Sequence, residues 1–99
     1  PQQLCVGPLI LDTRAHTVQV RGRDITLTAK EYALLEYLAR RTGDVVSRSD
    51  IVDHVWGEHD DHRSNVIDVY IQRLRRKIDS GSGASLIRTR RGEGYQLLP

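Results

Sequence analysis

Apolar and polar residues alternate with a period of two through the first quarter of the chain. The alternating apolar positions are Leu4, Val6, Leu9, Leu11, Val18, Val20, Ile25 and Leu27. A period of two is typical of strands that bury one face, and breaks at 7–8, 13–16 and 21–24 favour turns. The pattern therefore predicts four short strands in an antiparallel meander, whose apolar face needs helices to cover it.

A helical spacing replaces this alternation from Thr28 onward. Thr28 and Glu31 have the spacing of a capping box, so we expect a first helix to begin there and to end near Gly43. Ser47 is expected to cap a second helix, which Gly57 ends. The buried sides of these two helices are predicted to contain Tyr32, Leu34, Leu35, Leu38, Ala39, Ile51, Val52, Val55 and Trp56.

The third helix is predicted over residues 64–79, with Ser64 as its N-cap. Its buried stripe is formed by Ile67, Ile71, Leu74 and Ile78. The opposite face carries Asn65, Val69, Gln72, Arg73 and Arg76. Arginine pairs with guanine, Asn or Gln pairs with adenine, and a small apolar group contacts a thymine methyl. On this helix alone, a DNA-reading helix and a merely amphipathic soluble helix both remain open.

Residues 86–98 predict a β-hairpin, with arms at 86–89 and 94–98. Its tip reads Arg90-Arg91-Gly92-Glu93-Gly94, and the two glycines suit the positive φ angles of a tight turn. Folding does not need two arginines at such a tip, so we expect them to project from the body. A short strand at 45–46 and a Gly/Ser-rich turn at 80–85 complete the expected elements.

The charge of the chain is unevenly distributed. The 99 residues, enough for one domain, carry a formal net charge of only +2. The segment 63–91 holds eight Arg or Lys residues against Asp68 and Asp79, a net charge of +6, which leaves −4 for the remainder. A basic half is an electrostatic footprint for phosphates, and an ordinary solvated face is the alternative.

Cysteine usage and hydropathy indicate the compartment. The single cysteine, Cys5, excludes an internal disulfide and suits the reducing cytoplasm. Cys5 lies within the apolar alternation, so we expect a buried structural thiol. No apolar run approaches the roughly 20 residues of a membrane span, so no membrane partner is expected. Because the sequence begins at Pro1 without methionine, we expect it to be part of a longer protein.

The predicted elements combine into a helix-turn-helix followed by a basic hairpin, an α+β arrangement that extends over residues 1–99. Its motifs, in chain order, are Leu27-Thr28 with Glu31, Leu34-Leu35, Leu38, Val46-Ser47-Arg48, Val55-Trp56-Gly57, Asn65-Val66-Ile67-Asp68-Val69, Leu74-Arg75-Arg76-Lys77-Ile78 and Thr89-Arg90-Arg91-Gly92-Glu93-Gly94-Tyr95. These motifs resemble the winged-helix effector domains of OmpR/PhoB-type response regulators. The resemblance implies a winged helix-turn-helix with a four-stranded N-terminal antiparallel sheet, three helices and a C-terminal β-hairpin wing.

The same resemblance implies partners for the chain. Members carry an N-terminal receiver domain that a sensor histidine kinase phosphorylates, and that domain is expected outside this sequence. Members also bind tandem direct repeats of double-stranded DNA as head-to-tail homodimers. Their loop between the second and third helices contacts RNA polymerase, and here that loop contains Glu58, His59, Asp60, Asp61 and His62. Because no apolar residue ties the loop to the core, we expect it to be exposed and adaptable.

The expected DNA-binding residues come from the third helix, its approach and the wing. They are Arg63, Asn65, Val69, Gln72, Arg73, Arg76, Lys77, Thr89, Arg90 and Arg91. By resemblance the third helix enters the major groove and the wing reaches the adjacent minor groove or backbone. Arg90 departs from the apolar residue common before the wing arginine, which leaves open whether Arg90 or Arg91 inserts. Asp68 and Arg75, on the flank of the helix, are expected to form a structural or interprotomer pair.

Other classes of function have weaker support in the sequence. His54, His59 and His62 with the neighbouring acids have the side chains of a zinc or copper site, but their spacing matches no compact motif, so neither a metal nor a cofactor is expected. No nucleophile–base pattern and no phosphate-binding glycine loop is present, so we expect no enzyme activity. The remaining alternative is a protein-interaction module whose basic face binds an acidic partner.

Overall fold

The computed structural model describes residues 2–79 and 85–99, and it confirms the predicted meander. The strands are β1 (Gln3–Val6), β2 (Leu9–Asp12), β3 (Thr17–Val20) and β4 (Arg23–Ile25). They form one antiparallel sheet in the order β1-β2-β3-β4. Most of the turn predicted at 80–85 lies outside the described residues.

One face of this sheet supplies part of the core. The register aligns Leu4 with Leu11 and Val6 with Leu9, so the predicted alternating positions share a face. The prediction for Cys5 is wrong, because its side chain is exposed. Cys5 lies between Leu4 and Val6, and successive side chains of a strand point to opposite faces.

Three helices follow the sheet, and two of their predicted caps are confirmed. They are α1 (Ala29–Arg40), α2 (Arg48–Val55) and α3 (Val66–Ile78). Thr28 and Glu31 form both halves of the predicted capping box, and the Ser47 side chain accepts a hydrogen bond from the Asp50 N–H. Other ends differ by one to three residues: α1 ends at Arg40 rather than near Gly43, α2 ends before Trp56 rather than at Gly57, and Asn65, not Ser64, is the N-cap of α3.

The C-terminal hairpin is formed by β5 (Ile87–Arg90) and β6 (Gly94–Leu97). Arg90 pairs with Gly94, so the exposed turn is residues 91–93. The short strand expected at 45–46 is a single bridge, in which Val46 exchanges two backbone hydrogen bonds with Tyr95. The hairpin is therefore attached to the segment that leads into α2.

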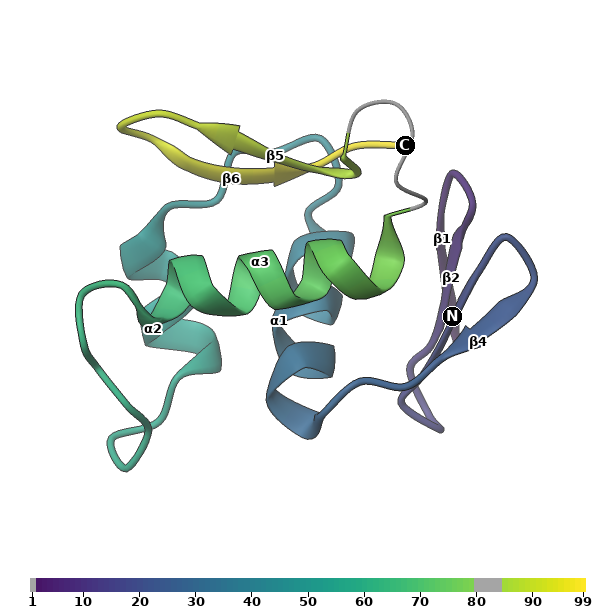
Figure 1. The fold of residues 1–99 in the computed structure, drawn as a ribbon, viewed down its shortest axis with the longest axis horizontal. Coiled ribbons are helices and arrows are strands. Elements are labelled where there is room, and N and C mark those ends of the chain that lie inside the picture. The colour runs from purple at the N-terminus through teal and green to yellow at the C-terminus, as the bar shows by residue number, and fades with distance from the viewer. Residues whose placement is uncertain (1, 80–84) are drawn as a thin grey trace.

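Figure 1 shows how these parts are arranged around α3. The meander lies at one end of the molecule, the hairpin runs along one side of α3, and the loop between α2 and α3 lies at the end away from the sheet. The core is continuous from the inner sheet face to the helices and includes Ile67, Ile71, Leu74 and Ile78, the predicted buried stripe of α3. None of the helices in the described part of the chain is long and apolar enough to cross a membrane.

An ion pair between a buried carboxylate and a partly exposed lysine joins two of the helices. The Glu31 carboxylate is 2% exposed and accepts a hydrogen bond from Lys77 Nζ at 2.6 Å. Burial raises the pKa of Glu31, but the bonds from Lys77 and from the Thr28 N–H outweigh it and hold the pKa below its usual value. Lys77 therefore links α3 to the N-terminus of α1.

Candidate nucleic-acid interface

The outward face of α3 forms a shallow hollow with the predicted reading residues along it. This hollow, of 420 Å³, is lined by Asn65, Asp68, Val69, Gln72, Arg73 and Arg76. Val69 is 39% exposed, one of two exposed large apolar side chains among the described residues. The Asn65 side chain makes no capping hydrogen bond, so its amide is not committed to the helix end. An apolar group flanked by amides and guanidinium groups can recognise the methyl group of thymine and the hydrogen-bonding edges of adenine and guanine.

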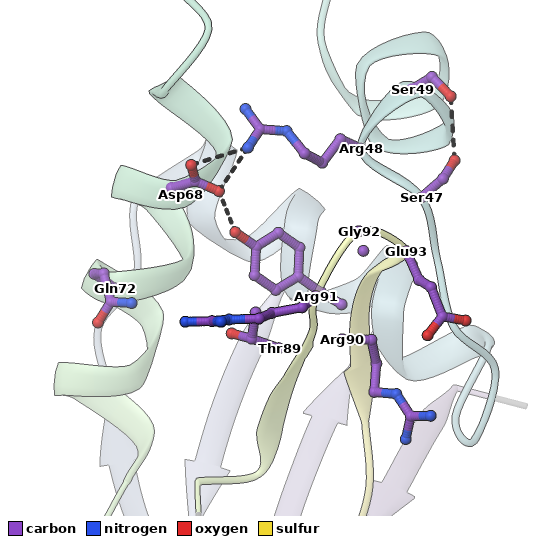
Figure 2. A pocket seen from close by; sticks show the side chains of 12 residues that line it. Ser47, Arg48, Ser49, Asp68, Gln72, Thr89, Arg90, Arg91, Gly92 and Glu93 are labelled. Atoms are coloured by element: carbon purple, nitrogen blue, oxygen red, sulfur yellow. Dashed lines mark hydrogen bonds and ion pairs between the residues drawn. The ribbon is translucent and has the colours of Figure 1, made fainter.

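A larger cleft separates this helix from the hairpin. It measures 630 Å³ and is lined by Ser47, Arg48, Ser49, Asp68, Gln72, Thr89, Arg90, Arg91, Gly92, Glu93, Gly94 and Tyr95. Figure 2 shows that Thr89 and Arg91 lie on the side of the hairpin that faces Gln72, whereas Arg90 points away from α3. This separation follows from the alternation of side chains along a strand. It gives Arg91, not Arg90, a side chain on the same side as the outward face of α3.

Four arginines of this surface have no acidic partner. Among residues 2–79 and 85–99, no carboxylate forms a salt bridge with Arg73, Arg76, Arg90 or Arg91. The Arg73 guanidinium carbon lies 5.0 Å from the centre of the Tyr70 ring, which supports the side chain without neutralising it. Cations without partners are available to phosphates.

Asp68 and Arg75 do not pair with each other within the chain, so the structural form of the predicted pair is wrong, whereas a pair between protomers stays a prediction. Asp68 accepts hydrogen bonds from Arg48 at 2.9 and 3.0 Å and from the Tyr95 hydroxyl (Figure 2). Arg75 donates to the carbonyl of Ile87 at 2.8 and 3.1 Å and to the Thr89 hydroxyl at 2.7 Å. The two residues are seven positions apart, about 10 Å along the helix axis, so each finds a nearer partner on another element.

Three of the expected DNA-binding residues have partners within the protein. Arg63 forms a salt bridge of 2.6 Å with Asp61, and that hydrogen bond raises the pKa of Arg63. Lys77 is held by Glu31, on the flank of α3 rather than in the hollow. The Thr89 hydroxyl accepts from Arg75, although Thr89 remains exposed beside the cleft.

Polar contacts hold the loop between α2 and α3, which was expected to be adaptable because no apolar residue ties it to the core. Asp60 accepts from Lys30 Nζ at 2.6 Å and from the Gly57 N–H at 2.7 Å. The Lys30 bond lowers the pKa of Asp60, and the Arg63 bond likewise lowers the pKa of Asp61. The side chains of Glu58 and His59 are 90% and 98% exposed, so these two residues form the accessible tip.

The histidines have separate environments. His54 stacks on Tyr37 with ring centres 5.3 Å apart, and its Nδ1 lies 2.8 Å from the Asp50 carbonyl oxygen. His62 Nε2 lies 2.7 Å from the Gly57 carbonyl oxygen. In the described ranges, no three His, Cys, Asp or Glu side chains come together as a metal-binding group.

Fold and surface together define the chain as a winged-helix domain of the DNA-binding class. Residues 22–97 match the family described as "Transcriptional regulatory protein, C terminal". The chain belongs to this family, and the predicted resemblance to OmpR/PhoB-type regulators is confirmed.

Individual relatives agree with this assignment. The chain is 41% identical over 97 residues to the probable transcriptional regulatory protein TcrX of Mycobacterium tuberculosis, covering 98% of this chain but 41% of TcrX. It superposes on the DNA-binding domain of CpxR from E. coli with a TM-score of 0.84 at 33% identity, over 99% of this chain and 97% of that chain. It also matches the Klebsiella pneumoniae RstA DNA-binding domain in complex with RstA box, with a TM-score of 0.86 at 26% identity, over 99% and 98% of the two chains.

Sequence patterns missed the side chains at the back of the cleft. Ser47 and Ser49 line it from the α2 side, and Tyr95 contributes its hydroxyl to Asp68. Ser47 is recognisable from sequence as a cap, but its place next to the wing depends on the Val46–Tyr95 bridge. No local pattern reports such a bridge, because its partners are 49 residues apart.

Proposed function

We propose that this chain is the sequence-specific DNA-binding domain of a transcriptional regulator in a two-component system. In this proposal α3 enters the major groove and the hairpin reaches the adjacent minor groove with Arg91. The observation that carries the proposal is that the hollow of α3 and the side chain of Arg91 face the same direction. Within residues 2–79 and 85–99, the arginines of both form no salt bridge with a carboxylate. The DNA complex of the RstA domain supports the assignment by similarity.

The reading role is assigned to the exposed face of α3. Val69 contacts a thymine methyl, Gln72 and Asn65 pair with adenine, and Arg73 and Arg76 contact guanine or phosphate. Arg63 and Lys77 have partners within the protein, so we assign them no more than a supporting electrostatic role. The wing arginine adds affinity in the narrow minor groove, where the negative potential is strongest.

The regions that make up the rest of the regulator are proposals of the same kind. TcrX is more than twice as long as the match, and we infer that a receiver domain, phosphorylated by a sensor histidine kinase, precedes residues 1–99 in the whole protein. In this proposal two copies bind tandem repeats as a head-to-tail homodimer. The loop 57–65 of one copy then faces RNA polymerase. A single cysteine suits work in the reducing cytoplasm.

Selection of bound duplexes from a random pool, followed by footprinting, tests the proposal. We expect one enriched motif, protected from cleavage, and binding that weakens as salt rises. Val69→Asp then lowers affinity for the enriched site by about 1–3 kcal/mol, with a much smaller change on random duplex. An unenriched pool, or equal losses on both duplexes, contradicts base reading and favours a general acidic partner.

A further inference from the structure

Two polar links join α3 to the hairpin, one near each end of the helix. The Tyr95 hydroxyl of β6 donates to Asp68 in the first turn of α3. Arg75, in the last turn, donates to the Ile87 carbonyl and the Thr89 hydroxyl of β5. The links are two helical turns apart, so together they fix both the separation and the tilt of the hairpin relative to the helix.

The hydrogen bond between Tyr95 and Asp68 stays formed across the physiological pH range. Tyr95 is 7% exposed, and burial, reinforced by the bond to Asp68, raises its pKa to about 12, so the hydroxyl stays a donor. Arg48 balances the charge of Asp68 and donates a further bond to the Ser64 carbonyl. Asp68 therefore joins α2, α3 and β6 at one point, as Figure 2 shows.

The first link lies close in the chain to two groups that are proposed to meet DNA. Gln72 lies one helical turn after Asp68 on α3, and Arg91 is four residues before Tyr95 across the hairpin turn. A carboxylate is repelled by phosphates, and Tyr95 is buried, so neither is suited to contact DNA itself. Asp68 and Tyr95 therefore affect DNA binding through the distance that they set between Gln72 and Arg91.

We propose that Asp68, Tyr95 and Arg75 are positioning residues that hold the wing at the offset from α3 needed to engage two neighbouring grooves at once. The sugar–phosphate backbone separates the two grooves, so an arginine displaced along the duplex loses its contact. A wing fixed before binding also avoids the entropic cost of ordering it on DNA. This inference rests on the proposed function and assigns roles to residues that make no DNA contact.

Tyr95→Phe tests the first link by removing one oxygen atom. The measurement is a double-mutant cycle on the selected duplex, in which Arg91→Ala is made in the parent and in Tyr95→Phe. We expect Arg91→Ala to weaken binding about tenfold in the parent but less than about threefold in Tyr95→Phe. Asp68→Asn, which keeps the shape but loses the charge pair with Arg48, is expected to reduce the Arg91 effect in the same direction.

Tyr32→Phe is the matched control. Tyr32 is 3% exposed and donates to the Asp12 carbonyl at 3.3 Å, on the sheet side of the molecule. We expect it to melt at a temperature similar to that of Tyr95→Phe and to keep the full tenfold effect of Arg91→Ala. A merely structural role of the Tyr95 bond predicts equal behaviour of the two variants in the cycle.

The possible outcomes distinguish failure of the positioning role from failure of the proposed DNA-binding function. Sequence-specific binding by the parent, with an undiminished Arg91 effect in both Tyr95→Phe and Asp68→Asn, overturns the positioning role alone. A diminished effect in Tyr32→Phe as well overturns it too, because the cause is then general destabilisation. A parent that binds all duplexes equally overturns the proposed function, and the positioning role with it.

Discussion

The hairpin turn at 91–93 and the loop at 57–65 are both exposed and charged, yet their charges are used differently. In the loop, Asp60 bonds to Lys30 and Asp61 to Arg63, so most of its charge is neutralised within the protein. In the hairpin, neither Arg90 nor Arg91 has a carboxylate partner among the described residues. Net charge alone therefore does not distinguish a phosphate-binding surface from another exposed one.

This difference has a physical consequence for partners. An arginine without an acidic partner can neutralise a DNA phosphate and so release the cations condensed on the duplex, and that release contributes free energy to binding. An arginine such as Arg63, already paired with Asp61, releases little. The loop instead presents a fixed shape whose exposed side chains include Glu58 and His59, which is the type of surface that another protein recognises. Substitutions in the two regions should therefore have different effects on stability, DNA affinity and transcription.

Gly94, the first residue of β6 beside the hairpin turn, is the position where a substitution is expected to have the largest effect. Gly94 has a φ of 141°, and a Cβ there would collide with the Val46 carbonyl oxygen and lie 2.8 Å from its carbon. We expect Gly94→Ala to destabilise the domain by roughly 2–4 kcal/mol, because the hairpin must separate from Val46. Thermal unfolding measures the loss.

Gly92→Ala is the control for that experiment. Gly92 has a φ of 72°, but nothing lies within 4 Å of the position that an alanine methyl group would occupy, so only the backbone strain applies. The expected loss is about 1 kcal/mol. Equal losses in the two glycine variants contradict attachment of the wing through Val46.

The two wing arginines are expected to differ in their effect on DNA affinity. Arg91 faces α3 and Arg90 faces away, so Arg91→Ala should lose about 1–3 kcal/mol at the selected site and Arg90→Ala less than half as much. The double variant should lower the salt slope by about one to two. Titrations at several salt concentrations measure both quantities, and a larger loss for Arg90→Ala reverses the assignment.

Much of the architecture was predictable because its signals are local. Period-two alternation predicted the meander, and the Thr28–Glu31 spacing predicted the start of α1. The partners of Asp68 and Lys77 were not predictable in this way. Arg48 lies 20 residues from Asp68, and Glu31 lies 46 residues from Lys77, so only tertiary packing brings each pair together.

Polar pairing also limited the prediction of the DNA-binding residues. Sequence identified the face of α3 correctly as exposed, since helical periodicity separates it from the buried stripe. It could not show that Lys77 is paired with Glu31, because a paired lysine and an unpaired lysine at exposed helix positions give the same sequence pattern. Likewise, the choice between Arg90 and Arg91 needed the register of β5 with β6.

The loop should affect transcription without affecting DNA affinity. We expect Glu58→Ala with His59→Ala to change operator binding by less than about 0.5 kcal/mol, because these side chains take no part in holding the loop. Activated transcription by the whole regulator should fall. Asp60→Ala with Asp61→Ala should give the same loss through a different cause, because the loop is released from Lys30 and loses its internal bond between Asp61 and Arg63.

Gel-shift and run-off transcription assays on the same preparations distinguish these results. Unchanged activation by both double variants contradicts a polymerase contact at this loop. A loss of DNA affinity in either variant instead indicates that the loop approaches the duplex.

The smallest expected effect is a change in the pKa of one carboxyl group. The bond from Lys30 holds the pKa of Asp60 below its ordinary value of 3.8, so the bond contributes to loop order above that value and is lost as pH falls through the lower, folded pKa. Lys30→Gln should raise the pKa of Asp60 toward 3.8 and leave that of Asp61, whose main partner is Arg63, unchanged. Carboxyl chemical shifts followed by NMR between pH 2 and pH 6 (a range of about two units on either side of an ordinary Asp pKa) measure both groups in one sample. If the pKa of Asp60 is the same in the parent and in Lys30→Gln, the Lys30 bond does not fix the loop. The Arg63–Asp61 salt bridge is then the remaining difference in charge pairing between the loop and the wing.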